Sequence, residues 1–310
     1  MAVYLITGGG GFIGSNLARH GVETGHEVRV IDDFSTGHRA NLDSIQDRIT
    51  LFDGSILDVE LLGEAMKGVD YVLHQAAVPS VPRSVENPLH SNEVNVTGTL
   101  KVFVSARDAG VKRVVFASSS SVYGLAEVMP LKESLPRGPI SPYGVTKATD
   151  ELYGANFTDL YGLDVVALRY FNVFGPHQDP HSAYAAVIPI LIRQMLAGEP
   201  PTVHGDGLQA RDFSYIDNVV SANFKACAAA GSLSGVYNIA CGVSTTLLDL
   251  VGHINTILGT TIEPVFEAGR AGDIRYSHAD ITKAREGFGY TPVMDIEAGL
   301  EQTVAWIKEQ

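Results

Sequence analysis

The segment TGGGGFIG at residues 7–14 decides the fold. It follows an apolar run at residues 3–6 and opens a stretch of helical spacing that reaches residue 23. Gly8, Gly11 and Gly14 form a G-x-x-G-x-x-G pattern. Glycine permits a tight turn and lets a pyrophosphate approach the backbone at the positive N-terminus of a helix. Because glycine clusters also occur in ordinary turns, the residues around this one decide its meaning.

The next predicted strand ends in two acidic residues, Asp32 and Asp33. Asp32 lies 18 residues after Gly14, where a carboxylate accepts hydrogen bonds from the ribose of a dinucleotide. Its charge would repel a 2′-phosphate, so the sequence favours NAD over NADP. His38 and Arg39 follow closely in the chain and keep NADP open as the alternative.

The first half of the chain alternates between two kinds of segment. Short β-branched runs predict strands at residues 3–6, 27–31, 49–52, 70–73, 113–117 and 164–169. Helical spacing predicts helices at residues 12–23, 58–66, 92–109 and 143–161. This alternation predicts an α/β protein with a doubly wound parallel sheet, the Rossmann fold.

After residue 172 the alternation breaks up, with five prolines between residues 176 and 201. We therefore predict two domains. Residues 1–171 form a dinucleotide-binding domain, to which a segment at about 213–241 is added. Residues 172–310 mainly form a smaller, partly discontinuous substrate domain.

The composition argues against several classes of protein. A formal net charge of −13 disfavours binding to nucleic acid or to an anionic membrane. The apolar runs fall short of the roughly 20 residues that span a bilayer. The chain starts without a secretory signal pattern, so we expect a cytoplasmic location. Cys227 and Cys241 lack metal-type spacing, and we expect no metal site and no disulfide.

A tyrosine and a lysine stand four residues apart, at Tyr143 and Lys147, on one face of a predicted helix. A nearby ammonium lowers the pKa of a phenol from about 10, as a base working near neutral pH requires. This is the only Tyr-x-x-x-Lys pair among the 12 tyrosines. The preceding predicted strand leads into the serine run at residues 118–121. A serine there can bond the oxygen that the tyrosine deprotonates; the alternative is a plain polar loop.

Taken together, these motifs resemble the extended short-chain dehydrogenase/reductase family, with the UDP-hexose 4-epimerases as the nearest branch. The likeness continues through RYFNVFGP at residues 169–176, RDFSYID at 211–217 and RAGD at 270–273. It implies an enzyme that uses NAD to invert C4 of a UDP-sugar through a transient 4-keto intermediate. Tyr143 would be the acid and base, Lys147 its partner, and Ser119 the residue that bonds the 4-oxygen. Ser119 is chosen because it stands four residues before Tyr123, with Ser120 as the fallback.

The resemblance also implies the residues that contact the cofactor NAD. They are Gly8, Gly11, Phe12, Ile13, Gly14, Asp32, Asp33, Ser35, Thr36, Gly37, Ser55, Ile56, Gln75, Ala76, Ala77, Asn95, Tyr143, Lys147 and Tyr170. Family members often carry an aspartate at the position of Ser55. Here the hydroxyl of Ser55 would have to make the adenine contact.

The substrate contacts implied in the same way are Ser119, Ser120, Tyr143, Asn172, Gln178, Ala186, Val187, Val203, His204, Arg211, Arg270, Asp273 and Ser277. Arg211 and Arg270 can neutralise a diphosphate through charge-assisted contacts. In the epimerases that this chain resembles and that are restricted to UDP-glucose and UDP-galactose, a bulky tyrosine stands at the position that matches Ser277. The small serine predicts interconversion of UDP-N-acetylglucosamine and UDP-N-acetylgalactosamine, and also of UDP-glucose and UDP-galactose. A shift of one residue in this match would put Tyr276 there instead.

Other functions remain as alternatives. Sugar-nucleotide dehydratases typically carry Asp-Glu after the catalytic threonine, and a decarboxylase carries a glutamate in this loop, where this chain has Ser120 and Ser121. A non-catalytic NAD sensor has the same fold, but such proteins commonly lose the Tyr–Lys pair. The resemblance further implies a homodimer through the helices near residues 92–109 and 143–161, whose apolar faces suit a core equally well.

Overall fold

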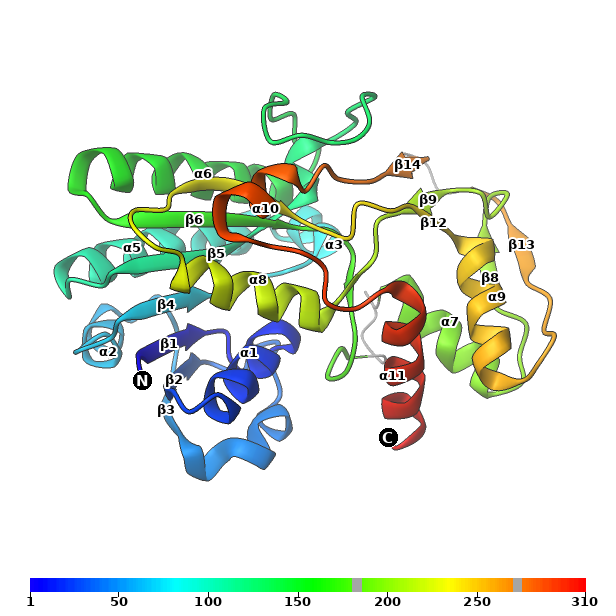
Figure 1. Cartoon of the computed structure of the whole chain (residues 1–310), viewed down its shortest axis with the longest axis horizontal. Helices are drawn as coiled ribbons and strands as arrows, with labels where there is room; N and C mark the ends of the chain where they lie inside the picture. The colour runs from blue at the N-terminus through cyan, green and yellow to red at the C-terminus, as the bar shows by residue number, and fades with distance from the viewer. Residues whose placement is uncertain (180–185, 270–274) are drawn as a thin grey trace.

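The computed structural model of the chain describes residues 1–179, 186–269 and 275–310. At its centre lies a parallel sheet in the order β11-β6-β5-β4-β1-β2-β3 (Figure 1). The strands are β1 (Val3–Thr7), β2 (Glu27–Asp32), β3 (Ile49–Asp53), β4 (Tyr71–His74), β5 (Arg113–Ser119), β6 (Asp164–Tyr170) and β11 (Gly235–Ile239). The six strands predicted from the sequence are present, and the doubly wound α/β fold is confirmed.

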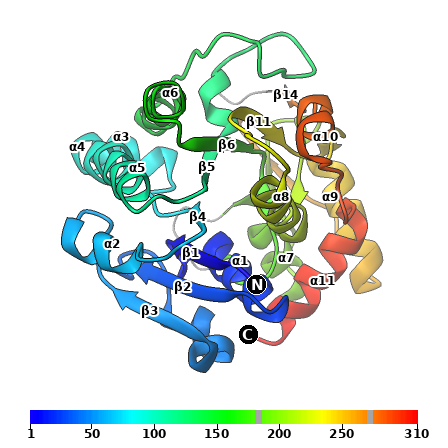
Figure 2. The same ribbon diagram turned by 60° about the vertical axis from the view of Figure 1, so that its left-hand side comes forward.

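Helices cover both faces of this sheet (Figure 2). On one face lie α2 (Val59–Ala65), α5 (Thr99–Asp108) and α6 (Pro142–Tyr161), and on the other lie α1 (Phe12–Glu23) and α8 (Ile216–Ala228). Neighbouring side chains of a strand therefore enter different cores. Leu5 packs on the α2, α5 and α6 side, whereas Tyr4 and Ile6 pack on the other side. Burial on both faces explains why these strands read as continuous apolar runs.

A second lobe stands beyond the carboxyl ends of the strands (Figure 1). Its helices are α7 (Val187–Leu196), α9 (Leu247–Leu258) and α11 (Ile296–Lys308). Its strands pair as β8 (Thr202–His204) with β13 (Val265–Glu267), and as β9 (Ala210–Arg211) with β12 (Thr245–Thr246) and β14 (Tyr276–Ser277). Two further strands, β7 (Val173–Phe174) and β10 (Ser214–Tyr215), join the lobe to the sheet, and α10 (Thr282–Phe288) packs on β11.

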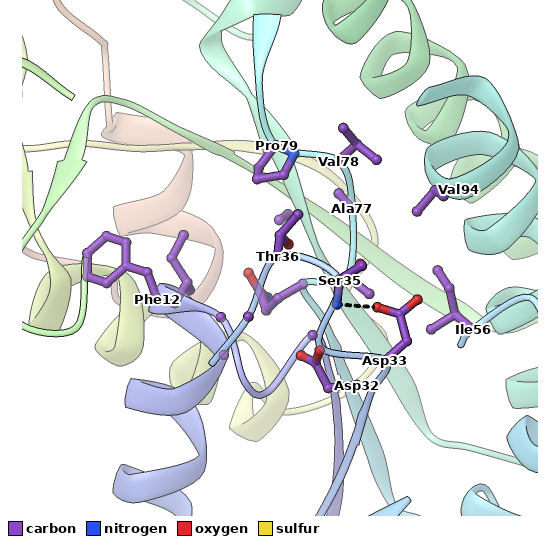
Figure 3. Close-up of a pocket in the computed structure, with 18 of the residues that line it drawn as sticks. Phe12, Asp32, Asp33, Ser35, Thr36, Ile56, Ala77, Val78, Pro79 and Val94 are labelled. Carbon is purple, nitrogen blue, oxygen red and sulfur yellow. Dashed lines mark hydrogen bonds between the residues drawn. The ribbon is translucent and has the colours of Figure 1, made fainter. Parts of the chain in front are cut away.

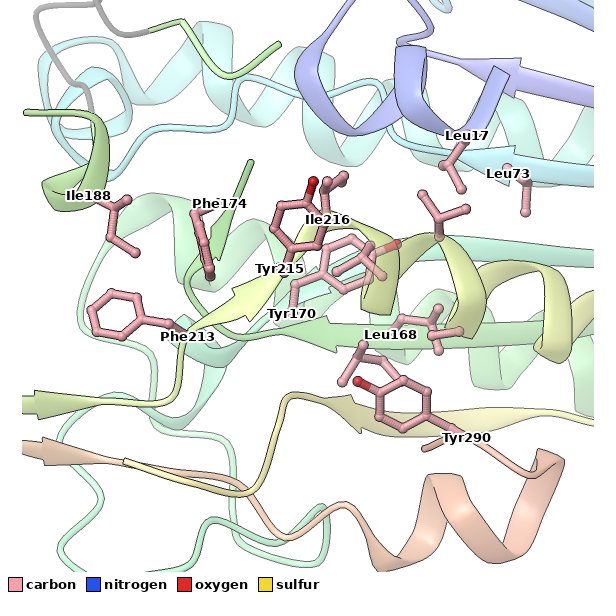
Figure 4. Packing of buried hydrophobic residues seen from close by; sticks show 14 of the residues in the cluster. Leu17, Leu73, Leu168, Tyr170, Phe174, Ile188, Phe213, Tyr215, Ile216 and Tyr290 are labelled. Atoms are coloured by element: carbon pink, nitrogen blue, oxygen red, sulfur yellow. The ribbon is translucent and has the colours of Figure 1, made fainter. Parts of the chain in front are cut away.

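One hydrophobic core runs through both lobes (Figure 4). Leu73 and Leu168 of the central sheet belong to the same buried cluster as Ile188 of α7 and Phe213 of the second lobe. The chain also returns from the second lobe to the sheet, because α8 and β11 follow the lobe's first strands. The proposed division at residue 171 therefore separates two parts that share one core.

The helix predicted at residues 92–109 is present, but it starts earlier and contains a π-helical turn that the sequence does not predict. The chain forms α3 (Val81–Glu86), α4 (Pro88–Asn92), a π-helical turn at Glu93–Gly98 and then α5. The wider turn carries Asn95, whose buried amide accepts a hydrogen bond from the Val78 backbone N–H (2.7 Å) and donates one to the Thr146 hydroxyl (3.1 Å). Such turns in helices occur often beside functional sites, and this one ties α5 to the β4 loop and to α6.

Candidate active site

A cavity of about 440 Å³ opens at the carboxyl ends of the central strands (Figure 3). All the predicted cofactor contacts except Asn95 line it, together with Ser119, Asn172 and Gln178. Val78, Pro79 and Val94 form part of its wall, and no sequence motif marks these three residues. Parallel α/β sheets bind their ligands at this edge, where the strand order reverses. In this sheet the reversal lies between β1 and β4.

The glycine turn is shaped so that a side chain cannot enter it. Gly8 has φ +69°, and a Cβ on Gly14 would lie 2.1 Å from the Gly8 carbonyl oxygen. Directly after the turn α1 begins, with Gly11 as its N-cap and no side chain capping it. The first N–H groups of a helix lack partners within the helix. This uncapped positive end of α1 fits the pyrophosphate of a dinucleotide.

The carboxylate of Asp32 closes the cavity at the end of β2. It accepts hydrogen bonds from the backbone N–H groups of Gly10 (2.8 Å) and Phe34 (2.7 Å). Burial raises the pKa of this carboxyl, while the two amides oppose that shift. The Ser35 N–H donates to Asp33 (3.0 Å), which fixes the loop beside it (Figure 3).

The two residues that kept NADP open both lie beside carboxylates, since His38 Nε2 stands 3.8 Å from an Asp179 carboxylate oxygen. Arg39 forms an ion pair with Asp53 and stacks over the Phe34 ring at 4.0 Å. A 2′-phosphate at Asp32 would meet a carboxylate and no unpaired guanidinium from Arg39. This arrangement favours NAD.

A polar chain stands at the opposite end of the cofactor cavity. The Asn223 amide donates to the Tyr170 hydroxyl (2.8 Å), and that hydroxyl donates to the side chain of Gln75 (3.3 Å). Burial raises the pKa of Tyr170, so this phenol stays protonated. These hydrogen bonds hold Gln75 and Tyr170 at the cavity wall. There the two side chains can orient a ring of the cofactor, but a protonated phenol cannot act as a base.

Helix α6 carries Tyr143 and Lys147 into the cavity. Pro142 occupies the first turn, and the Ser141 side chain caps the helix by accepting from the Gly144 N–H. The Tyr143 N–H donates to the Ser84 hydroxyl of α3 (3.0 Å), so the start of the helix is anchored on both sides. Lys147 is 2% exposed and lies one turn further along the same face.

Ser119 stands at the end of β5, where it lines the cavity and accepts hydrogen bonds from the N–H (3.1 Å) and hydroxyl (2.8 Å) of Ser121. Ser120, the fallback, does not line the cavity. The preceding Ser118 donates to Glu151 of α6 (2.6 Å). Ser118 therefore fixes the serine turn against the helix that carries Tyr143.

Glu151 is the hub of a buried network that the sequence analysis missed. Arg169 of β6 donates two hydrogen bonds to it (2.8 and 2.7 Å), and Arg137 donates a third (2.7 Å). Burial acts to raise the pKa of Glu151, but the bonds from Arg169 and Ser118 hold it below its usual value. A buried acid four residues after Lys147, followed by an arginine in the next strand, is the signal that could have revealed this network.

The predicted substrate residues in the second lobe lie outside the cofactor cavity. They are Ala186, Val187, Val203, His204, Arg211 and Ser277. Arg270 and Asp273 lie outside the described residues. Val203 is fully buried in the core, and His204 lies 3.6 Å from Glu267 across the β8–β13 pair.

Ser277 of β14 faces Arg211 of β9 in register, and the Asp212 N–H donates to the Ser277 carbonyl (2.8 Å). The Ser277 side chain is buried, whereas Tyr276 is exposed and lies beneath the Arg275 guanidinium. The Asp212 carboxylate accepts from the N–H groups of Cys241 and Gly242, which ties the end of β9 to the segment that follows β11. The strand register thus presents Ser277 on the side away from Tyr276.

Other kinds of site find little support in the described part of the chain. Across residues 1–179, 186–269 and 275–310, no His, Cys, Asp and Glu side chains cluster in a way that could hold a metal ion. Cys227 and Cys241 are free thiols. None of the helices in the described ranges has the length and apolar character needed to cross a membrane.

Comparison with known proteins agrees with this geometry. The model of the NAD-dependent epimerase/dehydratase family matches residues 4–240. The structure resembles a UDP-N-acetylglucosamine 4-epimerase from Methanobrevibacter ruminantium in complex with UDP-N-acetylmuramic acid, at 41% identity and a TM-score of 0.95, over 100% of this chain and 99% of that one. A Thermotoga maritima UDP-glucose 4-epimerase with UDP-glucose matches at 38% identity and a TM-score of 0.93, over 99% of both chains. A Thermus thermophilus UDP-glucose 4-epimerase in complex with NAD matches at 34% identity and a TM-score of 0.88, over 99% of both chains. The chain belongs to the NAD-dependent epimerase/dehydratase family.

Proposed function

We propose that this protein is a UDP-hexose 4-epimerase that interconverts UDP-N-acetylglucosamine and UDP-N-acetylgalactosamine, and also UDP-glucose and UDP-galactose. The observation that carries the choice of sugar is the small, buried Ser277, with Tyr276 turned to solvent. The relatives include both UDP-N-acetylglucosamine and UDP-glucose 4-epimerases, which agrees with this dual range.

The lining of the cavity supports the proposed catalytic roles. Tyr143 takes the proton of the sugar 4-hydroxyl and gives it back to the same oxygen when the 4-keto intermediate is reduced, while Ser119 bonds that oxygen. Lys147 lines the same cavity one helical turn from Tyr143, and the family resemblance implies that it is the partner of this phenol. NAD, when bound, supplies the acceptor and donor of the C4 hydride. The positive end of α1, Asp32 and the wall formed by Gln75 and Tyr170 are the groups that would hold it.

The substrate is held from the second lobe. Arg211 of β9 is placed to neutralise the diphosphate, and Ser277 lies opposite it in the pair of strands. A backbone hydrogen bond at Asp212 fixes this register. From the family resemblance, we expect the volume at residue 277 to set the space for the sugar 2-substituent. An acetamido group needs that space, whereas a hydroxyl does not.

Dehydration and decarboxylation receive less support. In the part of the chain that the structure describes, Asp32 and Asp33 are the only carboxylates lining the cavity, and both stand at its ribose end. In the described ranges, the hydrogen bonds to the Ser119 hydroxyl oxygen come from Ser121 and not from a carboxyl group that could assist the elimination of water. A non-catalytic sensor would not need a buried lysine placed beside a cavity tyrosine.

The test is incubation of the purified protein with each UDP-sugar separately, followed by chromatography of the products. We expect conversion of both the acetylated and the non-acetylated pair. Ser277→Tyr should suppress the acetylated reaction through overpacking while sparing the smaller sugars. Conversion of UDP-glucose alone by the unmodified protein would refute the choice of sugar, and no conversion of any UDP-sugar would refute the epimerase assignment.

We also propose the homodimer that the resemblance implies, through α6 as expected but with α4 in place of the helix near residues 92–109, where no large hydrophobic side chain of the described chain is exposed. Leu89, Val145, Leu152 and Leu160 are exposed, and the last three lie seven or eight residues apart on one face of α6. A second copy would cover this apolar stripe. Sedimentation should give the mass of a dimer for the unmodified protein and of a monomer for Leu152→Lys; a monomer in both would contradict the proposal.

A further inference from the structure

An acidic side chain that the mechanism leaves unused lies next to Lys147. Asp150 of α6 is fully buried, and its Oδ2 lies 3.6 Å from the Lys147 Nζ. Among the described residues, neither oxygen of the Asp150 carboxylate has a hydrogen-bond partner. Burying a carboxylate that accepts no hydrogen bond costs free energy, and a nearby positive charge is needed to offset that cost.

Helix geometry puts this acid in line with the proposed catalytic pair. Tyr143, Lys147 and Asp150 stand at positions i, i+4 and i+7 of α6, which form one stripe along the helix. Tyr143 and Lys147 line the cavity, whereas Asp150 does not. Lys147 therefore lies between the phenol on its cavity side and the carboxylate on its protein side.

The other titratable groups nearby are occupied. His74 of β4 exchanges hydrogen bonds with Thr7 (2.6 Å) and Thr99 (2.9 Å), and burial together with the Lys147 charge lowers its pKa to about 3, so it is neutral. Glu151, the next residue of α6, is bound by Arg169 and Arg137. Within the described chain, Asp150 is the carboxylate that pairs with Lys147.

We infer that Asp150 is the buried counter-ion of Lys147, a positioning residue that sets, through Lys147, the pH range in which Tyr143 exchanges its proton. The inference rests on the proposed roles of Tyr143 and Lys147. A carboxylate at this distance stabilises the ammonium and partly offsets its pull on the phenol. Burial raises the pKa of Asp150 itself to about 7 and Lys147 opposes that rise, so the carboxyl carries its charge above about pH 7.

The test is Asp150→Asn, which removes the charge, keeps the shape and breaks no hydrogen bond of the described chain. Loss of a negative charge lowers the pH at which every nearby group gives up its proton. The alkaline limb of the pH profile of kcat, where Asp150 carries its charge in the unmodified protein, should therefore move to lower pH, by about one unit or more. Asp159→Asn is the matched control, because it removes the same charge from an exposed site on the same helix and should leave the profile in place.

A second measurement needs no turnover. The absorbance of the phenolate in the NAD complex, with the signal of Tyr143→Phe subtracted, should titrate at lower pH in Asp150→Asn than in the unmodified protein. If Asp150→Asn fails to fold, Asp150→Ala replaces it, and its phenolate should likewise titrate at lower pH than in the unmodified protein. An unmoved alkaline limb and an unmoved phenolate midpoint in a folded variant would overturn the inference, as would a fall in kcat that is equal at every pH. An unmodified protein that epimerises nothing overturns the proposed function, whereas the absorbance titration still tests Asp150.

Discussion

Replacing Gly14 by alanine is expected to damage both the fold and the cofactor site. The new Cβ would lie 2.1 Å from the Gly8 carbonyl oxygen and 2.7 Å from both the Gly8 carbonyl carbon and the Gly9 Cα. Non-bonded carbon atoms prefer about 3.5–4.0 Å, and these neighbours are backbone atoms that cannot rotate away. The turn must therefore shift by roughly 1 Å. Overpacking of this kind costs about 1–3 kcal/mol, and we expect the upper end of that range.

The same shift should weaken NAD binding by at least about tenfold, which corresponds to about 1.4 kcal/mol. Urea unfolding gives the stability, and titration with NAD gives the affinity. Gly63→Ala is the control, because Gly63 is exposed in α2 and its Cβ would meet nothing within 4 Å. That variant should gain up to about 1 kcal/mol from helix propensity and bind NAD normally. A Gly14→Ala protein with unchanged stability and NAD affinity would refute the reasoning.

Three further predictions concern single side chains. Tyr143→Phe should fold and bind NAD but lose roughly 10²–10⁴-fold in epimerisation rate; turnover near that of the unmodified protein would remove Tyr143 from the mechanism. Asp32→Ala should weaken NAD binding, and NADP bound by the unmodified protein as tightly as NAD would contradict the assigned role of Asp32. His74 has a folded pKa of about 3, below the unfolded value of about 6.5, so its contribution to stability is complete above pH 6.5 and is lost as the pH falls toward 3. The free energy of unfolding, measured in urea, should fall by roughly 1.4 kcal/mol for each pH unit below 6.5 because of His74. In His74→Gln the free energy of unfolding should depend less steeply on pH, and equal slopes for the two proteins would refute this prediction.

The central sheet could be predicted because its information is local. Each strand of residues 1–171 is a short β-branched run, and each predicted start lies within one residue of the observed one. The glycine turn comes directly after the first strand and Asp32 ends the second. The residues on the cofactor side of the cavity could therefore be predicted from the sequence. The comparisons also confirm the resemblance to the extended short-chain dehydrogenase/reductase family and its UDP-hexose 4-epimerase branch.

Features that depend on distant contacts could not be predicted. The π-helical turn at Glu93–Gly98 lets Asn95 form hydrogen bonds with both Val78 and Thr146. The apolar periodicity of the sequence carries no information about such long-range hydrogen bonds. The network around Glu151 joins four segments of the chain, and Asp150 reads in the sequence as one more acid on a helix. The domain boundary and the roles of the site residues stay predictions that the experiments above address.

The central claim is transient oxidation at C4 of a UDP-N-acetylhexosamine, and one isotope measurement tests it directly. The unmodified protein is incubated with UDP-N-acetylglucosamine deuterated at C4, and the product is analysed by mass spectrometry and NMR. We predict UDP-N-acetylgalactosamine that retains the deuterium at C4, because the hydride removed from one face is returned to the other. Absence of this product, or a product whose C4 position carries hydrogen from the solvent, would contradict the account.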